Sequence, residues 1–460
     1  MPLGLSQLPS DIILEIVTCL DLPDVVSLVL VRFQLLSTQR SFWISVLETT
    51  RRTYPLACSP DADLSRFTLE ALKQLASSYQ KLQLNWKRAE PQLVRAMVSN
   101  PLPDSEPAKF LVNIQGTDVF VLEKGTQVFC WNYKLAQLSP FPPVEVGYIQ
   151  LLFPTQHPGI CSVCVLAQNA SSLQTSVLTI THELGKVTSF TSEVFEAPVL
   201  EGDLRSLFAI EGVVGLIQLV EAQSYSTISF CSTRDIEPRL YHTLKLPRSM
   251  STSMDLLSDC ITYKGHLYSL IEDGYSVQIQ HVSRKDLVSG YCRSAGEYSC
   301  DIVPPPLVIG TAVCSMTSST ASYGLCAVFV RVERDDEKNM NCTSFTFVPT
   351  SLTHSVDDGL SSPLAFDSPC VTHRVDGILE DVNIAWLGNN GLAVVTDLPT
   401  QPHKLTLLRY HPVDKSVSQH LLNVPENLDL SILEAICVDE ATGSLYLTTQ
   451  DGLFSTLEYV

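Results

Sequence analysis

Hydrophobic residues recur at helical spacing in roughly the first 90 residues of the chain and at strand spacing in the rest. A spacing of three to four residues places apolar side chains on one face of a helix, whereas alternation places them on one face of a strand. The change falls at the stretch 100–107, which is rich in proline and polar residues and is typical of a linker. The pattern predicts an α + β multidomain protein, helical before this linker and all-β after it.

Residues 8–52 show the pattern of three short helices. Apolar residues from Ile12 to Leu20 form an unusually wide face on the first of them. Pro23 is tolerated in the first turn of the second helix, and the third is predicted to begin near Ser37. Such a unit either packs as a small cap on its own chain or presents an apolar face to another protein.

A longer amphipathic helix is predicted within 61–90. Apolar residues from Leu69 to Trp86 repeat at intervals of three and four with polar residues between them, and Thr68 or Ser65 is a suitable N-cap. This helix is predicted to brace the N-terminal helices against the following domain.

Five pairs of short apolar runs after the linker, each pair separated by a turn, predict β-hairpins. The pairs are 119–122 with 128–131, 215–219 with 227–230, 267–270 with 277–280, 392–395 with 405–408, and 444–447 with 453–456.

The hairpins recur at intervals of about 50 residues or multiples of that length, which is typical of a β-propeller. We therefore expect 108–460 to form a propeller of six or seven blades, each a four-stranded meander. A pair of Greek-key sandwiches is the alternative. Trp131-Asn132 is a single weak instance of the Trp-Asp pair that ends the third strand in WD repeats, and by itself does not place the chain among them.

The amino-acid composition argues against some classes of function. The chain has 460 residues, of which 45% are apolar and 17% charged, as expected of a folded globular protein. Its formal net charge of −19 argues against nucleic-acid binding, because affinity for phosphates needs clustered Lys and Arg. The 14 scattered cysteines, the lack of a signal peptide and the lack of a long apolar run predict a reduced, soluble, intracellular protein.

No motif for catalysis, metal binding or cofactor binding stands out. Cys161 and Cys164 have the spacing of a metal or redox pair, but they lie in an apolar, strand-like run with no further ligands except His157 nearby. We interpret them as ordinary strand cysteines and expect no catalytic residue, metal or cofactor. Residues that converge from different blades would leave no local motif, so a propeller enzyme stays an alternative.

The N-terminal stretch contains, in order, Leu8-Pro9, Ile12, Ile13, Ile16, Leu20-Asp21, Val25-Val26-Ser27-Leu28 and Ser41-Phe42-Trp43. In this order and spacing it resembles the F-box motif over 5–52. The resemblance rests on residue types and spacing that agree through most of the motif, and it implies an F-box domain that binds the Skp-type adaptor, and through it a cullin, of an SCF-type ubiquitin ligase. The adaptor-binding or motif-core residues that it implies are Leu8, Pro9, Ile12, Ile13, Ile16, Leu20, Leu28 and Trp43.

The sequence departs from the F-box pattern at Leu30–Phe33, where the family has about two more residues. Loss of two residues within a helix would rotate everything after it by roughly 200°. Either a loop absorbs the loss or the gene's exon assignment omits two residues.

The resemblance implies a non-catalytic substrate-recognition subunit whose 108–460 domain recruits an unknown protein substrate, in the cytoplasm, the nucleus or both, without a nucleic-acid or membrane partner. Two alternatives stay open: a propeller enzyme or ligand-binding protein, and a scaffold whose helical N-terminus packs only on its own chain.

Overall fold

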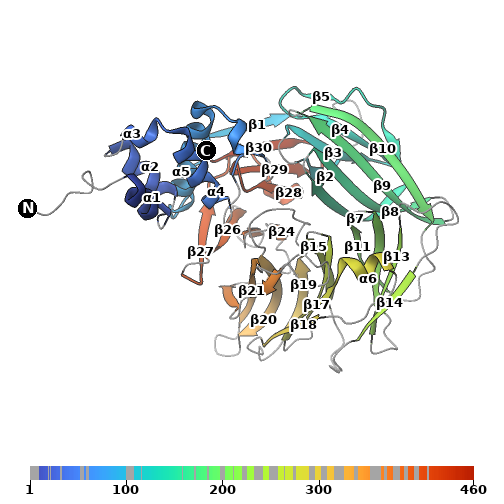
Figure 1. Cartoon of the computed structure of the whole chain (residues 1–460). Coiled ribbons are helices and arrows are strands. Elements are labelled where there is room, and N and C mark those ends of the chain that lie inside the picture. Colours follow the sequence, from blue (N-terminus) through green and yellow to red (C-terminus); the bar gives the residue numbers. More distant parts are fainter. Residues whose placement is uncertain are drawn as a thin grey trace, which may run out of the picture.

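The structure, a computed structural model, has helices at its N-terminal end and β-sheets in the remainder (Figure 1). It describes residues 10–18, 20, 22–31, 34–51, 56–58, 62–99, 108–114, 117–157, 159–169, 172–183, 186–196, 203–210, 212–219, 225–232, 242–247, 257–263, 265–272, 276–289, 296–301, 308–314, 326–335, 340–352, 364–366, 370–376, 384–387, 392–397, 403–411 and 414–460. The predicted linker 100–107 lies outside these residues.

Four short helices occupy the stretch in which three were predicted. They are α1 (Ser10–Thr18), α2 (Leu22–Val31), α3 (Gln34–Ser37) and α4 (Arg40–Thr50). The additional helix, α3, is a single turn of four residues. Helix α4 begins at Arg40 instead of near Ser37, because Gln39 before it has extended backbone angles (φ −89°, ψ 114°).

The predicted bracing helix is α5 (Leu69–Trp86). Its N-cap is Thr68, whose Oγ1 accepts a hydrogen bond from the Ala71 N–H at 3.2 Å and so satisfies one of the unpaired amides of the first turn. Both the cap and the last residue, Trp86, agree with the prediction.

All five predicted hairpins are present, and each supplies the second and third strands of a sheet. This shared position explains the interval near 50 residues, because the equivalent strands of successive meanders recur once per sheet. The pairs are β3 (Val119–Lys124) with β4 (Gln127–Asn132), β12 (Val213–Leu219) with β13 (Tyr225–Ser232), β16 (His266–Glu272) with β17 (Ser276–Val282), β25 (Leu392–Asp397) with β26 (Lys404–His411), and β29 (Ser444–Thr449) with β30 (Phe454–Glu458).

Two further hairpins, β8 (Ile160–Asn169) with β9 (Ser172–Glu183) and β20 (Cys326–Asp335) with β21 (Met340–Leu352), were not predicted. The first strands of the sheets are β2 (Lys109–Asn113), β7 (Tyr148–His157), β11 (Asp203–Ile210), β15 (Leu257–Tyr263), β19 (Val308–Cys314), β24 (Ile384–Leu387) and β28 (Leu433–Asp439). The outer strands are β1 (Arg95–Ser99), β5 (Gln137–Leu138), β6 (Val144–Glu145), β10 (Lys186–Glu196), β14 (His242–Pro247), β18 (Gly296–Asp301), β22 (Leu364–Phe366), β23 (Val371–Asp376) and β27 (Ser416–Leu422); helix α6 (Arg284–Ser289) follows β17.

The described strands form seven antiparallel sheets of four or five strands. One of them, here called the closing sheet, joins the two ends of the β part: β1, which follows the helices, pairs with β30, with Arg95 opposite Glu458 and Ser99 opposite Phe454. Pairing of the first strand with the last hairpin ties the sheets into a closed arrangement.

The sheets follow one another in a ring. First strands of successive sheets contact one another at β7–β11, β11–β15, β15–β19, β24–β28 and β28–β2, while β23 packs on β27. Consecutive meanders arranged around an axis are the architecture of a β-propeller (Figure 1). The Greek-key alternative is wrong for the described sheets, because their neighbouring strands are consecutive in the chain apart from β1 and the extra strands β6 and β23.

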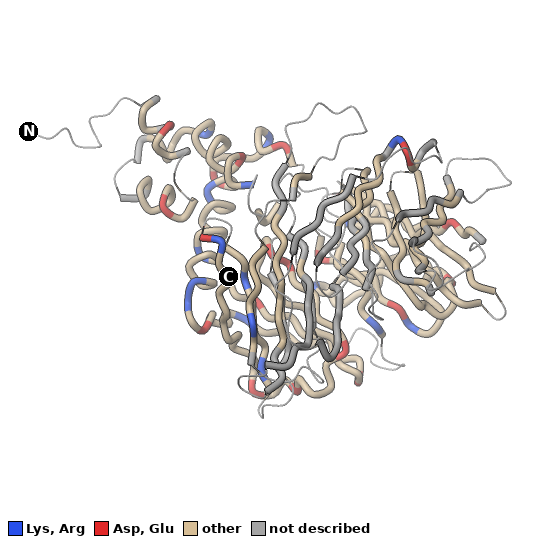
Figure 2. The backbone as a smooth tube through the Cα atoms, turned by 90° about the horizontal axis from the view of Figure 1, so that it is seen from below, with Lys and Arg blue, Asp and Glu red and all other residues tan. Residues whose placement is uncertain are grey.

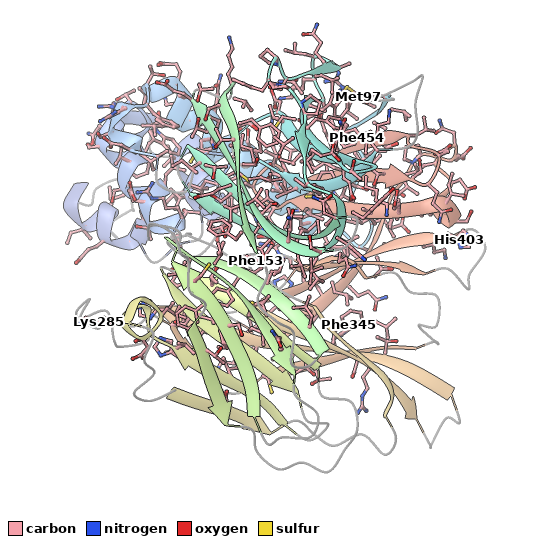
Figure 3. All side chains as sticks on the ribbon, turned by 90° about the vertical axis from the view of Figure 1, so that its right-hand side faces the viewer. Met97, Phe153, Lys285, Phe345, His403 and Phe454 are labelled. Atoms are coloured by element: carbon pink, nitrogen blue, oxygen red, sulfur yellow. The ribbon has the colours of Figure 1, made fainter. Side chains whose placement is uncertain are left out.

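The core of the ring lies between adjacent sheets. At the closing sheet, Phe454 of β30 packs edge-on against Trp131 of β4 with 4.9 Å between ring centroids, and Met97 of β1 packs against the same cluster (Figure 3). A second cluster joins β2, β3 and β4 to β8 and β9. In the closing sheet the central strand β29 is buried on both faces.

Candidate functional site

Helix α1 carries apolar residues on two sides, and the rest of the chain covers one of them. Ile13 and Val17 are 6% and 4% exposed and belong to the core of the helical part. Ile12 and, just beyond the helix, Leu20 are 42% and 37% exposed, and Ile16 is half-buried. These exposed isoleucine and leucine side chains lie close together on one short segment. They form an apolar surface to which a partner could bind.

The five predicted adaptor-binding residues other than Ile12, Ile16 and Leu20 fall into three groups. Ile13 and Trp43 are buried; the Trp43 indole Nε1 donates a hydrogen bond to the Ser37 carbonyl at 3.0 Å, so both side chains form the core of the helical part and not its surface. Leu28 is half-buried against that core. Leu8 and Pro9 lie outside the described residues.

The irregular stretch Leu30–Phe33 covers the end of α2 and the two residues after it. Helix α2 ends at Val31 and the separate α3 begins at Gln34; Arg32 and Phe33 lie outside the described residues. Leu36 is 4% exposed and reaches the same core as Ile13. Leu36 therefore lies in the core of the helical part despite the irregularity at Leu30–Phe33.

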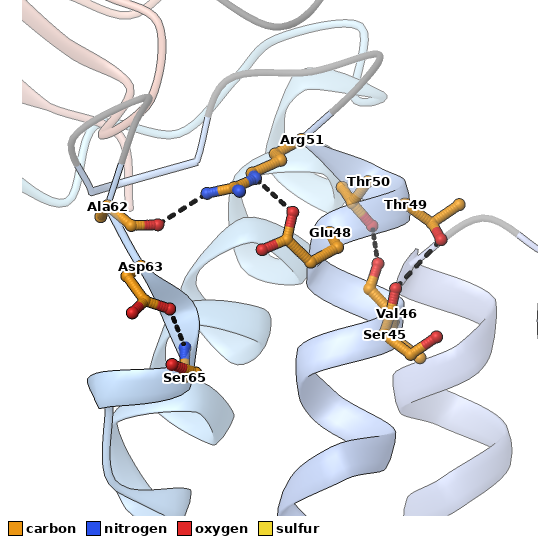
Figure 4. A network of polar contacts seen from close by, with 9 residues as sticks. All are labelled: Ser45, Val46, Glu48, Thr49, Thr50, Arg51, Ala62, Asp63 and Ser65. Atoms are coloured by element: carbon orange, nitrogen blue, oxygen red, sulfur yellow. Dashed lines mark hydrogen bonds and ion pairs between the residues drawn. The ribbon is translucent and has the colours of Figure 1, made fainter.

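A network of polar contacts holds the segment between α4 and α5 against α4 (Figure 4). The Arg51 guanidinium forms an ion pair with Glu48 at 2.6 Å and donates to the Ala62 carbonyl at 2.7 Å. Asp63 accepts a hydrogen bond from the Ser65 N–H at 2.9 Å. Hydrogen bonds from the side chain and backbone of Ser65 hold the pKa of the Asp63 carboxyl below its ordinary value. The described residues at 62–65 are therefore held close to the C-terminal end of α4.

Helix α5 belongs to two cores. Residues as far along the helix as Tyr79, including Leu72, lie in the core of α1–α4, and Gln80 Nε2 donates to Ser27 Oγ of α2 at 2.9 Å. Residues from its second half, Leu82 and Trp86, lie in the core formed by β26, β27 and the closing sheet. One continuous helix thus couples the exposed face of α1 to the ring.

Polar contacts fix the C-terminal end of α5. Arg409 of β26 donates to the Gln83 side-chain oxygen at 2.5 Å, and Asn85 Nδ2 donates to the Tyr459 carbonyl at 2.6 Å. His420 of β27 bonds through Nδ1 to the Arg88 carbonyl at 2.7 Å. Burial lowers the pKa of His420 from its ordinary value, which favours the neutral imidazole.

Cys161 and Cys164 do not have the arrangement of a metal or redox site. Cys161 and Cys164 are free thiols of β8 that lie in different hydrophobic clusters, one toward β2–β4 and the other toward β11–β13. Burial raises the pKa of Cys164 to about 12 and that of Cys161 further, so both stay protonated. Within the described ranges no group of three or more His, Cys, Asp or Glu residues is arranged to hold a metal ion.

Two largely buried polar clusters were not predicted, because strand pairing and sheet packing bring their members together. His266 Nδ1 and His281 Nε2 lie 2.9 Å apart in neighbouring strands, and burial lowers the pKa of His281 to about 4. Tyr446 lies beside Tyr133 and Asp439, and burial raises the pKa values of all three. Neither cluster has a local sequence signal.

Over the residues that the structure describes, taken as a whole, charged side chains do not gather at one place. Figure 2 shows Lys and Arg interspersed with Asp and Glu over both the helices and the sheets. No helix among the described residues is both long and apolar enough to cross a membrane.

No family model matches the sequence, and no curated protein matches it. Among solved structures, the chain is similar to the β-propeller domain of Cps50 (Swd1) from Myceliophteria thermophila, with 12% identity, coverage of 80% of this chain and 98% of that one, and a TM-score of 0.44. It is also similar to the β-propeller domain of Nup133 from Vanderwaltozyma polyspora (10% identity, 80% and 100% coverage, TM-score 0.40) and to the WD40 domain of SCAP from fission yeast (10%, 77% and 82%, 0.39). Because these values are low, the propeller assignment rests on the sheet topology of this chain.

Proposed function

We propose that this chain is the substrate-recognition subunit of an SCF-type ubiquitin ligase. In this proposal α1–α4 dock on a Skp-type adaptor, each of the seven sheets is one propeller blade, and the propeller holds a protein substrate. The chain supplies no catalytic group; its contribution is to hold the substrate near the ubiquitin-transferring subunits. It would act in the cytoplasm, the nucleus or both.

The observation that carries the proposal is the uncovered apolar side of α1. Ile12 and Leu20 stay exposed and Ile16 half-exposed, although Ile13 and Val17 in the same helix find partners within the chain. These three positions are among those that the F-box resemblance assigns to the adaptor. The two-core placement of α5 adds support, because a substrate receptor needs a fixed spacing between docking end and substrate end.

Binding of the full chain to a purified Skp-type adaptor, measured by pull-down and calorimetry, tests the proposal. We expect binding by the natural chain and its loss in Ile16→Asp and in Leu20→Asp, because a carboxylate buried unpaired in an apolar contact costs several kcal/mol. Ile160→Asp is the matched control, since Ile160 is 40% exposed but lies on β8 of the ring. Circular dichroism checks that all variants fold. No binding by the natural chain, or equal binding by all three variants, would contradict the proposal.

A scaffold without adaptor docking is the second candidate, and one observation favours it. The apolar residues that α1 does bury, Ile13 and Val17, share a continuous core with α5, as expected of a cap that packs on its own chain. The same measurement separates the two: a scaffold of this kind would leave the adaptor unbound and would tolerate Leu20→Asp without loss of any partner held by the propeller.

A further inference from the structure

The side of α5 that faces away from its two cores carries basic side chains and one leucine. Lys81, Lys87 and Arg88 are exposed, Lys73 is half-buried, and Leu84 is 53% exposed. At about 100° per residue, Lys73, Lys81, Leu84 and the C-cap residue Lys87 lie within about 120° of one another around the helix axis. Arg88 follows directly. These five residues are here called the basic face of α5.

The basic face has no counter-charge in the part of the chain that the structure describes. Helix α5 contains a single acidic residue, Glu70 in its first turn, and no other follows until Glu90. None of the four basic side chains belongs to an ion pair among the described residues. The whole chain has 49 acidic and 30 basic residues, so this face differs in sign from the protein that carries it.

Helix stability accounts for only part of this pattern. Lys87 and Arg88 lie at the C-terminal end, where the helix dipole favours a cation. Lys81 lies within the helix and has no Asp or Glu three or four residues away on either side, so it takes part in no stabilising pair of that kind. Leu84 is not among the residues of either core. Basic and apolar side chains on one exposed helix face are suited to a ligand that is both acidic and apolar.

We propose that the basic face of α5 binds an acidic segment of a partner protein in extended conformation, with an apolar side chain of that segment on Leu84. Lys73 and Arg88 are about 22 Å apart along the helix axis, a length that about seven extended residues cover. Lys73 and Lys81 are about 12 Å apart. Carboxylates that recur every three or four residues of the segment therefore each meet a basic side chain.

An acidic protein segment fits this face better than a nucleic acid does. The aromatic residues of α5, Tyr79 and Trp86, are both buried, so the helix exposes no ring on which a base could stack. A phosphate backbone would leave Leu84 without an apolar contact. The net charge of −19 also opposes the approach of a long polyanion.

The basic face is fixed at its C-terminal end, so a ligand does not have to order it. The Asn85 side chain donates to the Gln92 carbonyl and accepts from the Gln92 N–H, both at 2.8 Å. The Arg88 carbonyl is bound by His420 at 2.7 Å. The proposal concerns α5 and does not rest on adaptor docking by α1.

Fluorescence anisotropy of a dye-labelled peptide, Asp-Glu-Asp-Leu-Asp-Glu-Asp, titrated with the full chain tests the proposal. We expect saturable binding, with a dissociation constant at least about ten-fold higher in the double variant Lys73→Glu, Lys81→Glu, because each reversal replaces an attraction by a repulsion. Lys186→Glu is the matched control. Lys186 is exposed on β10, on the far side of the molecule from α5 (Figure 1), so its reversal should leave binding unchanged.

Two further measurements separate the charged from the apolar part of the contact. Added salt should weaken binding of the peptide, because it screens exposed charges. Leu84→Ala should raise the dissociation constant about three-fold or more for this peptide, but not for one in which serine replaces the leucine. If the double variant does not fold, Lys81→Glu alone takes its place.

No binding by the natural chain, or equal binding by the natural chain and the double variant, would overturn the proposal. The same holds if a single-stranded RNA of equal charge binds as tightly as the peptide, because the face would then be a site for any polyanion. The peptide titration contains no adaptor, so failure of adaptor docking by α1 would leave its result unchanged.

Discussion

Helices α1 and α5 are both amphipathic, but the fold covers their apolar faces to different extents. The apolar stripe of α5 is covered along its length, first by α1–α4 and then by β26, β27 and the closing sheet. Helix α1 is half as long, 9 residues against 18, and carries more apolar positions than its neighbours cover. A helix whose apolar stripe is covered along its whole length, such as α5, connects the two parts it packs against. A short helix with more apolar residues than its own chain covers, such as α1, keeps an apolar surface that another protein is able to bind.

The largest effect is expected at the end of α5 that enters the ring. Trp86 is 3% exposed and lies 5.4 Å from the Tyr459 ring, between centroids. Trp86→Ala should lower the free energy of unfolding by about 3–5 kcal/mol, because it removes a large buried side chain and leaves a cavity. Denaturant unfolding measures the change.

The neighbouring Leu84 serves as control for that prediction. It is 53% exposed on the same helix, so Leu84→Ala should change the free energy of unfolding by no more than about 0.5 kcal/mol. If both substitutions had equal effects, the end of α5 would not be a brace.

Two adjacent isoleucines of α1 sharpen the comparison within one helix. Ile13→Ala should cost about 2–4 kcal/mol of unfolding free energy, because Ile13 is 6% exposed in the helical core. Ile12→Ala should have little effect on stability, since Ile12 is 42% exposed, and should weaken adaptor binding instead. Thermal unfolding and adaptor calorimetry on the same two variants give both readouts. Loss of stability in Ile12→Ala equal to that in Ile13→Ala would mean that the uncovered side of α1 is internal.

A smaller effect is expected from the cap of α5. Thr68→Ala removes the hydrogen bond to the Ala71 N–H and should lower the free energy of unfolding by about 1 kcal/mol. Thr68→Ser retains the hydroxyl and should behave nearly like the natural chain. A Ser variant as unstable as the Ala variant would show that the methyl group, and not the cap, is what α5 needs.

The smallest effect is a pH dependence at the junction of α5 and β27. Burial lowers the pKa of His420 below its ordinary value, so the unfolded chain takes up the proton first as the pH falls. The stability that neutral His420 contributes is present above about pH 6.5 and is lost below it.

His420→Gln retains a donor for the Arg88 carbonyl but does not titrate. The decline in unfolding free energy between about pH 7 and pH 5 should therefore be shallower in the variant than in the natural chain. Other titrating groups contribute equally to both proteins, so the difference between the two slopes is the quantity to measure. If the unfolding free energy falls with pH equally steeply in the variant and the natural chain, His420 does not contribute to the pH dependence of stability.

Much of the fold was predictable because its signals are local. The turn before β29 is an example: Asp439 Oδ1 accepts from the Ala441 and Thr442 amides, and Gly443 has the positive φ of 67° that the hairpin requires. The hairpin of β8 and β9 was missed for an equally physical reason. Strand β8 is buried on both faces, so its apolar residues run on without the alternation that identifies a strand.

The candidate site was predicted only in part. Helical spacing identified the apolar residues of α1 but did not separate exposed Ile12 from buried Ile13, because either side of so apolar a helix could face the core. The same limit applies to Cys161 and Cys164, whose placement on opposite sides of β8 depends on which sheets lie next to it.

By itself the sequence determined the change from helices to strands, the position of α5 and five of the hairpins, since these follow from periodicity and turn chemistry over a few residues. Tertiary structure alone decided that residues 95–99 close the ring on 454–458 and which side of α1 remains uncovered. These outcomes depend on surfaces that meet from opposite ends of the chain, and a short apolar pattern specifies that a side chain needs a partner without specifying which one.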